Sequence, residues 1–244
     1  MRMRKKKNGG ARLSACAEYL LDNVCEPMTE PSLVFGRKGV PVLLEIGAGK
    51  GGFACEMARR NKDSVYFAME RVSDCVVLGA ELAKATAEER GDNLRFIVDT
   101  ADNLTKLFAN GTISKIFLNF SDPWSKKGYA KRRLTHRRYL AVYLNLLSDG
   151  GTLTFKTDND GLFDFTLEEI AAVGIKPDFV TRDLHNSERN EGNVMTEYEK
   201  NFSEQGKNIN MVEITKPCGF TIEIPEGLSK DRKDYKTMKE ESLV

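Results

Sequence analysis

The chain has 244 residues, with 37 Lys and Arg against 36 Asp and Glu and a formal net charge of +1. This length can bury the core of one large α/β domain, and the charge balance gives no global sign of a nucleic-acid binder. The five cysteines are scattered, which argues against a disulfide scaffold, and with only two histidines a metal site is not expected. The chain also lacks an apolar run of the roughly 20 residues that a membrane span requires. We expect a cytoplasmic protein that is a monomer or a homodimer.

Apolar, β-branched runs alternate along the chain with segments of helical composition. Strands are expected at 40–46, 64–69, 94–98, 113–120 and 152–156, and helices between them at 52–61, 72–89, 103–108 and 133–147. A further helix at 163–173 and two later strands at 177–184 and 211–214 extend the series. Because near-continuous apolar strands alternate with helices, the sequence predicts an α/β fold with a mainly parallel sheet and helices on both faces.

The two ends of the chain differ from this central series. The first 12 residues carry six Lys and Arg and no acid, whereas 229–241 is mostly charged with little apolar content. We therefore expect a basic N-terminal segment over 1–39 that packs on or flanks the domain, a main domain over 40–215 and a charged C-terminal extension over 216–244.

A glycine-rich turn follows the first expected strand. It reads Glu45-Ile-Gly47-Ala-Gly49-Lys-Gly51-Gly52, and Glu70 ends the second strand. Glycines there allow a backbone to approach a ligand closely, and an acid ending strand two suits an adenosine ribose. The pattern also satisfies G-x-G-x-x-G, which keeps an NAD-dependent dehydrogenase open. The E-x-G-x-G form that begins at Glu45 resembles the cofactor loop of class I S-adenosylmethionine methyltransferases, which favours that cofactor over NAD. The resemblance implies that the carboxylate helps to bind the cationic methionine moiety, directly or through water.

The stretch NFSDPWSKKGYAKRR, residues 119–133, brings together a carboxylate, an aromatic residue next to a proline, and a cluster of cations. Asp122-Pro123-Trp124 follows the fourth strand, whose carboxyl end faces a ligand held by the first strand in a doubly wound sheet. The segment 126–138 then holds seven Lys and Arg without an acid, a composition that suits RNA phosphates. The single proline departs from the Asp- or Asn-Pro-Pro-aromatic motif of adenine and cytosine amino methyltransferases.

These motifs, with Lys156-Thr157-Asp158-Asn159 and Thr196-Glu197-Tyr198-Glu199, resemble the tRNA (guanine-N7)-methyltransferase family over 1 to about 208. The resemblance implies a class I S-adenosylmethionine-dependent methyltransferase fold of about seven strands, the last reversed, and a reaction at guanine 46 of the tRNA variable loop. It implies cofactor contacts at Glu45, Gly47, Gly49, Glu70, Thr100, Ala101 and Asp122, and substrate contacts at Lys126, Asp158, Thr196, Glu197, Tyr198 and Glu199. Asp122 is the expected catalytic residue.

Two positions depart from the family pattern. Thr100 stands where the family often has Asp or Asn, so either Thr100 or Asp99 is expected to contact adenine, and Ser121 replaces a frequent proline. Guanine N7 carries no hydrogen, so we expect positioning to dominate catalysis, with Asp122 and Asp158 accepting hydrogen bonds from the base. A non-catalytic RNA-binding module with the same fold remains a rival interpretation.

Overall fold

The computed structural model describes residues 6–21 and 24–224, so the expected C-terminal extension lies mostly outside the described residues. Its strands are β1 Val42–Ile46, β2 Val65–Glu70, β3 Leu94–Val98, β4 Ile113–Asn119, β5 Leu147–Thr157, β6 Phe179–Thr181 and β7 Asn210–Thr215. Its α-helices are α1 Gly9–Ser14, α2 Gly52–Arg60, α3 Ser73–Ala85, α4 Ala87–Arg90, α5 Leu104–Leu107, α6 Arg137–Leu146, α7 Asp160–Ala172 and α8 Glu197–Glu204. Short 3-10 helices include Ala101–Asn103 and Lys127–Arg132.

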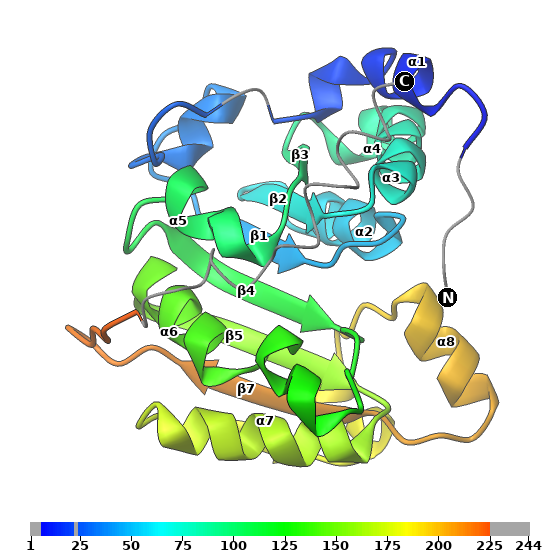
Figure 1. Ribbon diagram of the computed structural model, residues 1–244. Coiled ribbons are helices and arrows are strands. Elements are labelled where there is room, and N and C mark those ends of the chain that lie inside the picture. Colours follow the sequence, from blue (N-terminus) through cyan, green and yellow to red (C-terminus); the bar gives the residue numbers. More distant parts are fainter. Residues whose placement is uncertain (1–5, 22–23, 225–244) are drawn as a thin grey trace.

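The seven strands form one sheet in the order β3-β2-β1-β4-β5-β7-β6 (Figure 1). Strands β1 to β5 run parallel to one another, whereas β7 runs antiparallel to both β5 and β6. The sheet is therefore mixed, with its reversed strand between β5 and β6. The expected α/β class, the strand number and the reversal of the last strand in the chain are confirmed. The sheet is not wholly parallel, because β7 runs against the other six strands.

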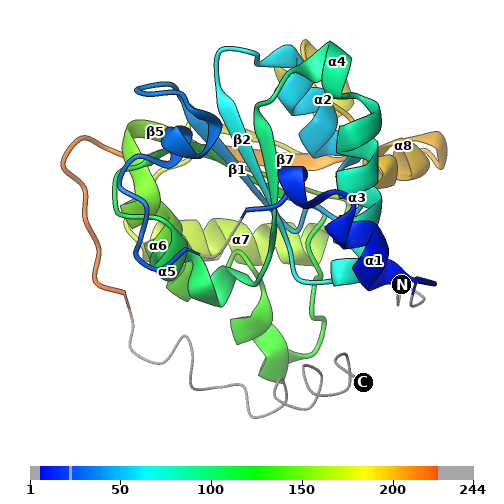
Figure 2. The ribbon, with the colours of Figure 1, turned by 90° about the horizontal axis from the view of Figure 1, so that it is seen from above.

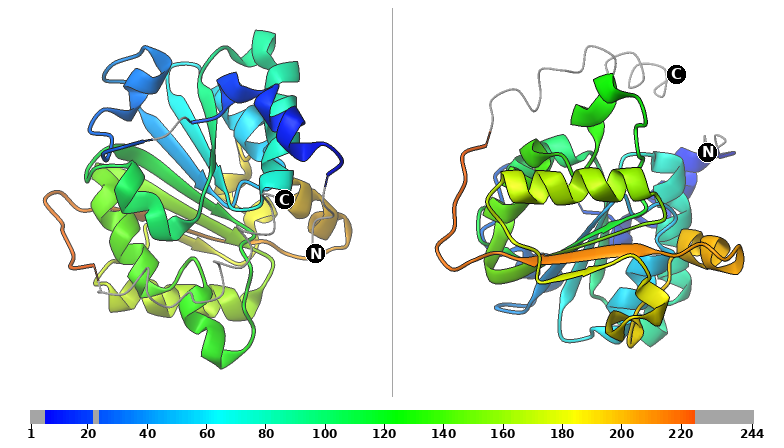
Figure 3. Two further views of the ribbon diagram at one scale, coloured as in Figure 1. Left: turned by 45° about the horizontal axis from the view of Figure 1, so that its top comes forward. Right: turned by 90° about the horizontal axis from the view of Figure 1, so that it is seen from below.

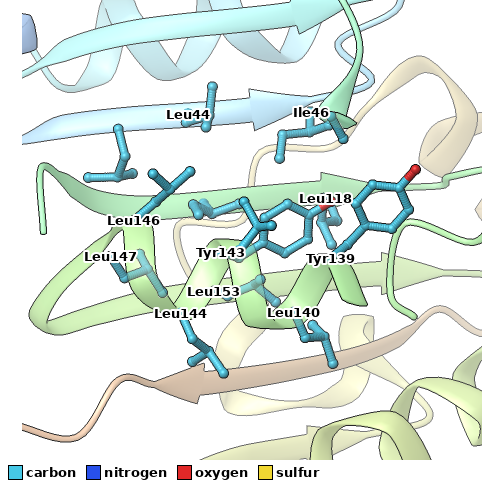
Figure 4. Packing of buried hydrophobic residues seen from close by; sticks show 14 of the residues in the cluster. Leu44, Ile46, Leu118, Tyr139, Leu140, Tyr143, Leu144, Leu146, Leu147 and Leu153 are labelled. Carbon is cyan, nitrogen blue, oxygen red and sulfur yellow. The ribbon is translucent and has the colours of Figure 1, made fainter. Parts of the chain in front are cut away.

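Helices cover both faces of the sheet (Figures 1 and 2). One face packs against α5, α6 and α7 through a core that includes Leu44 and Ile46 of β1 and Tyr139 and Tyr143 of α6 (Figure 4). The other face, which carries Leu43 of β1, packs against α1, α2 and α3. Alternate side chains of a strand point to opposite faces, so one apolar strand supplies both cores.

Three helix boundaries differ from the sequence-based expectation. Helix α6 begins at Arg137 rather than near 133, because the His136 side chain caps its first turn by accepting from Arg138 N. The helix expected over 72–89 is divided into α3 and α4 around Thr86. Helix α7 begins at Asp160, capped by the side chain of Asn159. Side-chain caps therefore fix the starts of α6 and α7, whereas the division at Thr86 has no side-chain cap bond within the described part of the chain.

The described part of the basic N-terminal segment lies beside α3. Arg12 of α1 forms a two-point ion pair with Glu81, with Nε 2.7 Å from Oε1. The Lys6 backbone N–H donates to Asp74 at 2.8 Å. Leu20 forms a parallel bridge to Phe96 at the β3 edge. These contacts cover one edge of the sheet, while the domain boundary at residue 39 stays a prediction.

Candidate active site

The carboxyl ends of β2, β1, β4 and β5 bring a row of polar side chains together. Glu70 ends β2, Glu45 lies near the end of β1, Asn119 ends β4, and Lys156 lies one residue before the end of β5. In Figure 1 the arrowhead of β4 points toward the side on which α8 lies. The row occupies the edge at which a doubly wound sheet binds its ligands.

The glycine-rich turn leaves room for a ligand beside its backbone. Gly47 has φ 85° and Gly49 has φ 55°, and a Cβ atom at either position would meet no atom within 4 Å. Gly51 differs, because a Cβ there would lie 2.6 Å from the Phe96 ring. Gly47 and Gly49 therefore border open space in a backbone conformation that favours glycine, whereas Gly51 permits close packing on β3.

Glu70 holds two loops through one carboxylate. Its Oε2 accepts from Gly49 N at 3.1 Å, and its Oε1 accepts from Val72 N at 2.8 Å. The carboxylate thus lies directly against the glycine-rich turn, and its position suits the hydroxyl groups of a ribose.

Glu45 is a buried carboxylate with only one of its oxygens paired. The residue is 2% exposed, and its Oε1 accepts from Asn119 Nδ2 at 3.0 Å. Burial raises the pKa of Glu45 to about 7, against the opposing effects of the Asn119 hydrogen bond and the Lys156 charge. Its Oε2 has no hydrogen-bond partner among the residues that the structure describes. The buried Tyr66 hydroxyl also has no partner within hydrogen-bonding geometry among these residues, and it lowers the pKa of Glu45 as a hydrogen-bond donor would. It and a donor from outside the chain are the two ways to satisfy this oxygen.

The turn after β3 uses Asp99 and Thr100 differently. Asp99 Oδ1 accepts from Thr100 N at 2.7 Å and from Asn103 Nδ2 at 2.8 Å, so this oxygen stabilises the turn itself. Thr100 Oγ1 donates to Asp102 at 3.3 Å, and Ala101 is buried. Which residue contacts adenine stays a prediction.

The Asp122-Pro123-Trp124 loop is held in an unusual backbone conformation. Phe120 and Trp124 have φ 50° and 41°, values rare outside glycine. Arg133 Nε donates to the Pro123 carbonyl at 2.9 Å, and Arg133 Nη2 donates to the Trp124 carbonyl at 3.3 Å. The first arginine after the helix Lys127–Arg132 therefore anchors the loop.

The Asp122 side chain projects from this loop toward solvent. It is 66% exposed and forms a long ion pair with Arg71, at 3.4 Å. Asp158 lies on the loop after the adjacent strand β5 and pairs with Lys207 at 3.2 Å. The two expected guanine contacts thus follow neighbouring parallel strands, since Asn119 pairs with Lys156 in the sheet. Their joint role stays a prediction.

The basic segment stands out from the body of the molecule. The bright-green helix Lys127–Arg132 projects away from the sheet in Figures 2 and 3. Arg132 lies over the rings of Trp124 and Tyr129, with its Cζ 5.3 and 4.7 Å from the ring centroids. Lys126, Lys127 and Lys131 are exposed. This projection places cations directly beside Trp124.

The 196–199 motif separates into internal and external residues. The Thr196 hydroxyl caps α8 by accepting from Glu199 N at 3.0 Å, and Glu199 is completely buried. Glu197 instead pairs with Lys50 of the glycine-rich turn at 2.8 Å, and Tyr198 is exposed. Glu197 and Tyr198 are thus exposed, and Thr196 is half-buried. Because Glu199 is buried, any effect that it has on a substrate would act through the position of α8.

Sequence reasoning missed the contributions of Asn119, Lys156 and Lys50. Lys156 offered a signal, because a lysine inside an otherwise apolar strand predicts a buried acidic partner. The partner itself, Glu199, lies 43 residues further along the chain. No group of three or more metal-ligating side chains occurs over 6–21 and 24–224. In the same ranges, none of the helices has the length and apolar character required to cross a bilayer.

Comparison with known proteins adds a family to this geometry. Residues 39–212 match the model of a family described as "Putative methyltransferase", which includes the tRNA 7-methylguanosine methyltransferases. An antibiotic-related methyltransferase of known structure is similar, with a TM-score of 0.56 and 14% identity. The match covers 81% of this chain and 96% of the antibiotic-related methyltransferase. The 16S rRNA methyltransferase KamB is similar with a TM-score of 0.55 and 11% identity, covering 88% and 96%. At these identities the structural likeness shows a shared fold.

Proposed function

The chain belongs to this methyltransferase family, and we propose that it transfers a methyl group from S-adenosylmethionine to N7 of a guanine in tRNA, at position 46 of the variable loop. Methyltransferase membership overturns the dehydrogenase alternative, because the glycine-rich turn then serves S-adenosylmethionine rather than NAD.

The residues at the carboxyl edge of the sheet fit this cofactor. Glu45 keeps an unpaired buried oxygen, Gly47 and Gly49 border open space, and the Glu70 carboxylate lies against the turn. An acid at each strand end suits the two polar parts of the cofactor, with Glu45 toward the cationic amino-acid half and Glu70 toward the ribose. When bound, S-adenosylmethionine supplies a methyl group on a positively charged sulfur.

Methylation of guanine N7 needs no general base. The nitrogen has an in-plane lone pair and no hydrogen, so the protein has no proton to remove before attack. Orientation then supplies much of the rate enhancement. In the proposed site, Asp122 and Asp158 accept hydrogen bonds from guanine N1–H and N2–H. Their negative charge favours the cationic purine that forms, and adenine would leave these acceptors unpaired.

The observation that carries the RNA part of the proposal is the position of the basic segment. Cations begin at Lys126, two residues after Trp124, and the 3-10 helix Lys127–Arg132 that follows projects from the body of the molecule (Figure 2). Arg133, just after this helix, donates to the carbonyls of Pro123 and Trp124, which ties the basic segment to the Asp122 loop. Phosphates supply much of the affinity of proteins for RNA, so this segment would guide a nucleotide toward Asp122. The exposed Tyr129 ring and Arg132 guanidinium offer surfaces for base stacking.

The test is methylation of an unmodified tRNA transcript with labelled S-adenosylmethionine, followed by borohydride reduction and aniline cleavage at 7-methylguanosine. The proposal expects cleavage at one variable-loop guanine, and a transcript with adenine at that position should remain unlabelled. Incorporation without cleavage would place the methyl on another atom, such as an exocyclic nitrogen. Binding of both ligands without incorporation would favour the non-catalytic RNA-binding module.

A further inference from the structure

Asn119 lies at the carboxyl edge of the sheet, and its one contact described so far is the hydrogen bond that it donates to Glu45. It follows Phe117, the residue of β4 that is in register with Glu45 of β1, by two positions. Side chains two residues apart in a strand share a face, so Asn119 and Glu45 lie on the same face of the sheet. A hydrogen bond of 3.0 Å from Asn119 Nδ2 to Glu45 Oε1 links the two side chains.

The pair leaves two acceptor oxygens without donors. Neither Glu45 Oε2 nor Asn119 Oδ1 has a hydrogen-bond partner within the described ranges, and both residues are more than nine-tenths buried. The Tyr66 hydroxyl of β2 lowers the pKa of Glu45 as a donor would, but it offers one hydrogen for the two oxygens. The nearby cation Lys156 does not supply a second. Its Nζ donates to Asn193 Oδ1 at 3.1 Å, Val194 O at 3.0 Å and Glu199 Oε2 at 2.6 Å, which uses all three hydrogens.

We propose that Asn119 is a positioning and specificity-determining residue for the amino-acid half of S-adenosylmethionine. Its amide nitrogen fixes the Glu45 carboxylate, and its amide oxygen joins Glu45 Oε2 as a second acceptor for the α-ammonium group, directly or through one water molecule. An ammonium has three donors and no acceptor, which matches two acceptor oxygens to which the described part of the chain offers only the one hydrogen of Tyr66. The inference rests on the cofactor of the proposed function and is independent of the tRNA target.

The charged and polar neighbours of Glu45 make this role measurable by pH. Asn119 faces it from β4, Lys156 from β5, and Glu70 and Tyr66 from β2. Burial raises the pKa of Glu45 most, and the Glu70 charge adds to that rise, whereas the Asn119 hydrogen bond, the Lys156 charge and the Tyr66 hydroxyl lower it. Loss of the amide donor therefore raises the pKa further. Because an ammonium binds the ionised carboxylate best, the pH at which affinity falls should move upward in Asn119 variants.

The experiment compares two adenosine ligands by calorimetry on the full chain. S-adenosylhomocysteine carries the amino-acid half, and 5′-methylthioadenosine lacks it. Asn119→Ala should weaken S-adenosylhomocysteine binding about 10- to 100-fold, the effect of losing hydrogen bonds to a charged group. Binding of methylthioadenosine should change less than about twofold. Asn145→Ala is the matched control, since Asn145 is also 7% exposed but bonds Ile222 on another part of the chain.

Asn119→Asp keeps the shape of the side chain and guards against a folding defect in the alanine variant. It places a second carboxylate against Glu45, so the pH midpoint of S-adenosylhomocysteine binding should rise by about one unit or more. Equal weakening of both ligands by Asn119→Ala, or an unmoved midpoint in Asn119→Asp, would overturn the proposal. These readings need no RNA, so they stand apart from the outcome of the tRNA cleavage assay.

Discussion

Lys156 Nζ lies 2.6 Å from Glu199 Oε2, and the two side chains are 3% and 0% exposed. Glu199 Oε1 also contacts His185 Nε2 at 3.0 Å and accepts from Asn193 Nδ2 at 2.6 Å. Burial lowers the pKa of Lys156, and the charge of Glu199 opposes that shift. For Glu199, burial raises the pKa, but the charge of Lys156 and the hydrogen bonds from Lys156, His185 and Asn193 outweigh it, so the pKa is lowered. The ion pair therefore joins α8 to the carboxyl end of β5.

Glu199→Gln should lower the free energy of unfolding by about 3 to 5 kcal/mol, because Lys156 would remain as a buried charge without its counterion. Chemical denaturation at neutral pH measures the loss. Glu197→Gln is the matched control on the same helix, because its pair with Lys50 is exposed and should contribute at most about 1 kcal/mol. A similar small loss in both variants would contradict the structural role assigned to Glu199.

Glu45→Gln should stabilise the protein without cofactor, and more so at higher pH. The pKa of Glu45 is raised from 4.5 to about 7 on folding. Its contribution to stability is therefore complete below pH 4.5 and is lost as the pH rises through 7. Between pH 6 and pH 8 the original protein should lose about 1 kcal/mol relative to Glu45→Gln.

Denaturant titrations of both proteins at the two pH values measure this difference. The same substitution should weaken S-adenosylhomocysteine binding, since the cationic half loses its carboxylate. A stability difference between the two proteins that does not change with pH would show that Glu45 does not titrate in this range.

Asp122→Asn should lower turnover at saturating S-adenosylmethionine and tRNA by roughly 10²-fold, the loss typical of one electrostatic contact to a transition state. The substitution keeps the shape of the side chain and removes its charge. Initial rates of methyl incorporation provide the measurement. Asp164→Asn is the control, because Asp164 of α7 is comparably exposed and also pairs with an arginine, Arg182. Normal turnover in Asp122→Asn would refute its catalytic assignment.

Replacing Lys126, Lys127 and Lys131 together by Gln should weaken tRNA binding and leave S-adenosylhomocysteine binding unchanged. Each lost phosphate contact should reduce the slope of log affinity against log salt concentration by about 1. Filter binding at several salt concentrations measures both quantities. Lys62→Gln is the control, because Lys62 is exposed and precedes β2, at the opposite end of the strand from Glu70. An equal effect of Lys62→Gln would mean that the segment acts only through net charge.

The order of strands and helices was predictable because local sequence carries it. Near-continuous apolar runs such as that of β1 are buried on both faces, and the alternation with helices indicated the parallel part of the sheet. The glycine-rich turn was predictable for a similar reason, since positive φ at Gly47 and Gly49 is a local requirement. Helix starts were less predictable, because caps such as Asn159 act through single side chains.

The sequence by itself determined the α/β class, the position of the ligand edge and the residue types gathered there, because these depend on periodicity and on contacts between near neighbours. Only the tertiary structure decided which residues act as partners. Glu199 turned out to be the buried counterion of Lys156, and Asn119 the donor to Glu45, 74 residues away along the chain. Burial and pairing between distant residues depend on how the sheet is assembled, and no local pattern encodes that assembly.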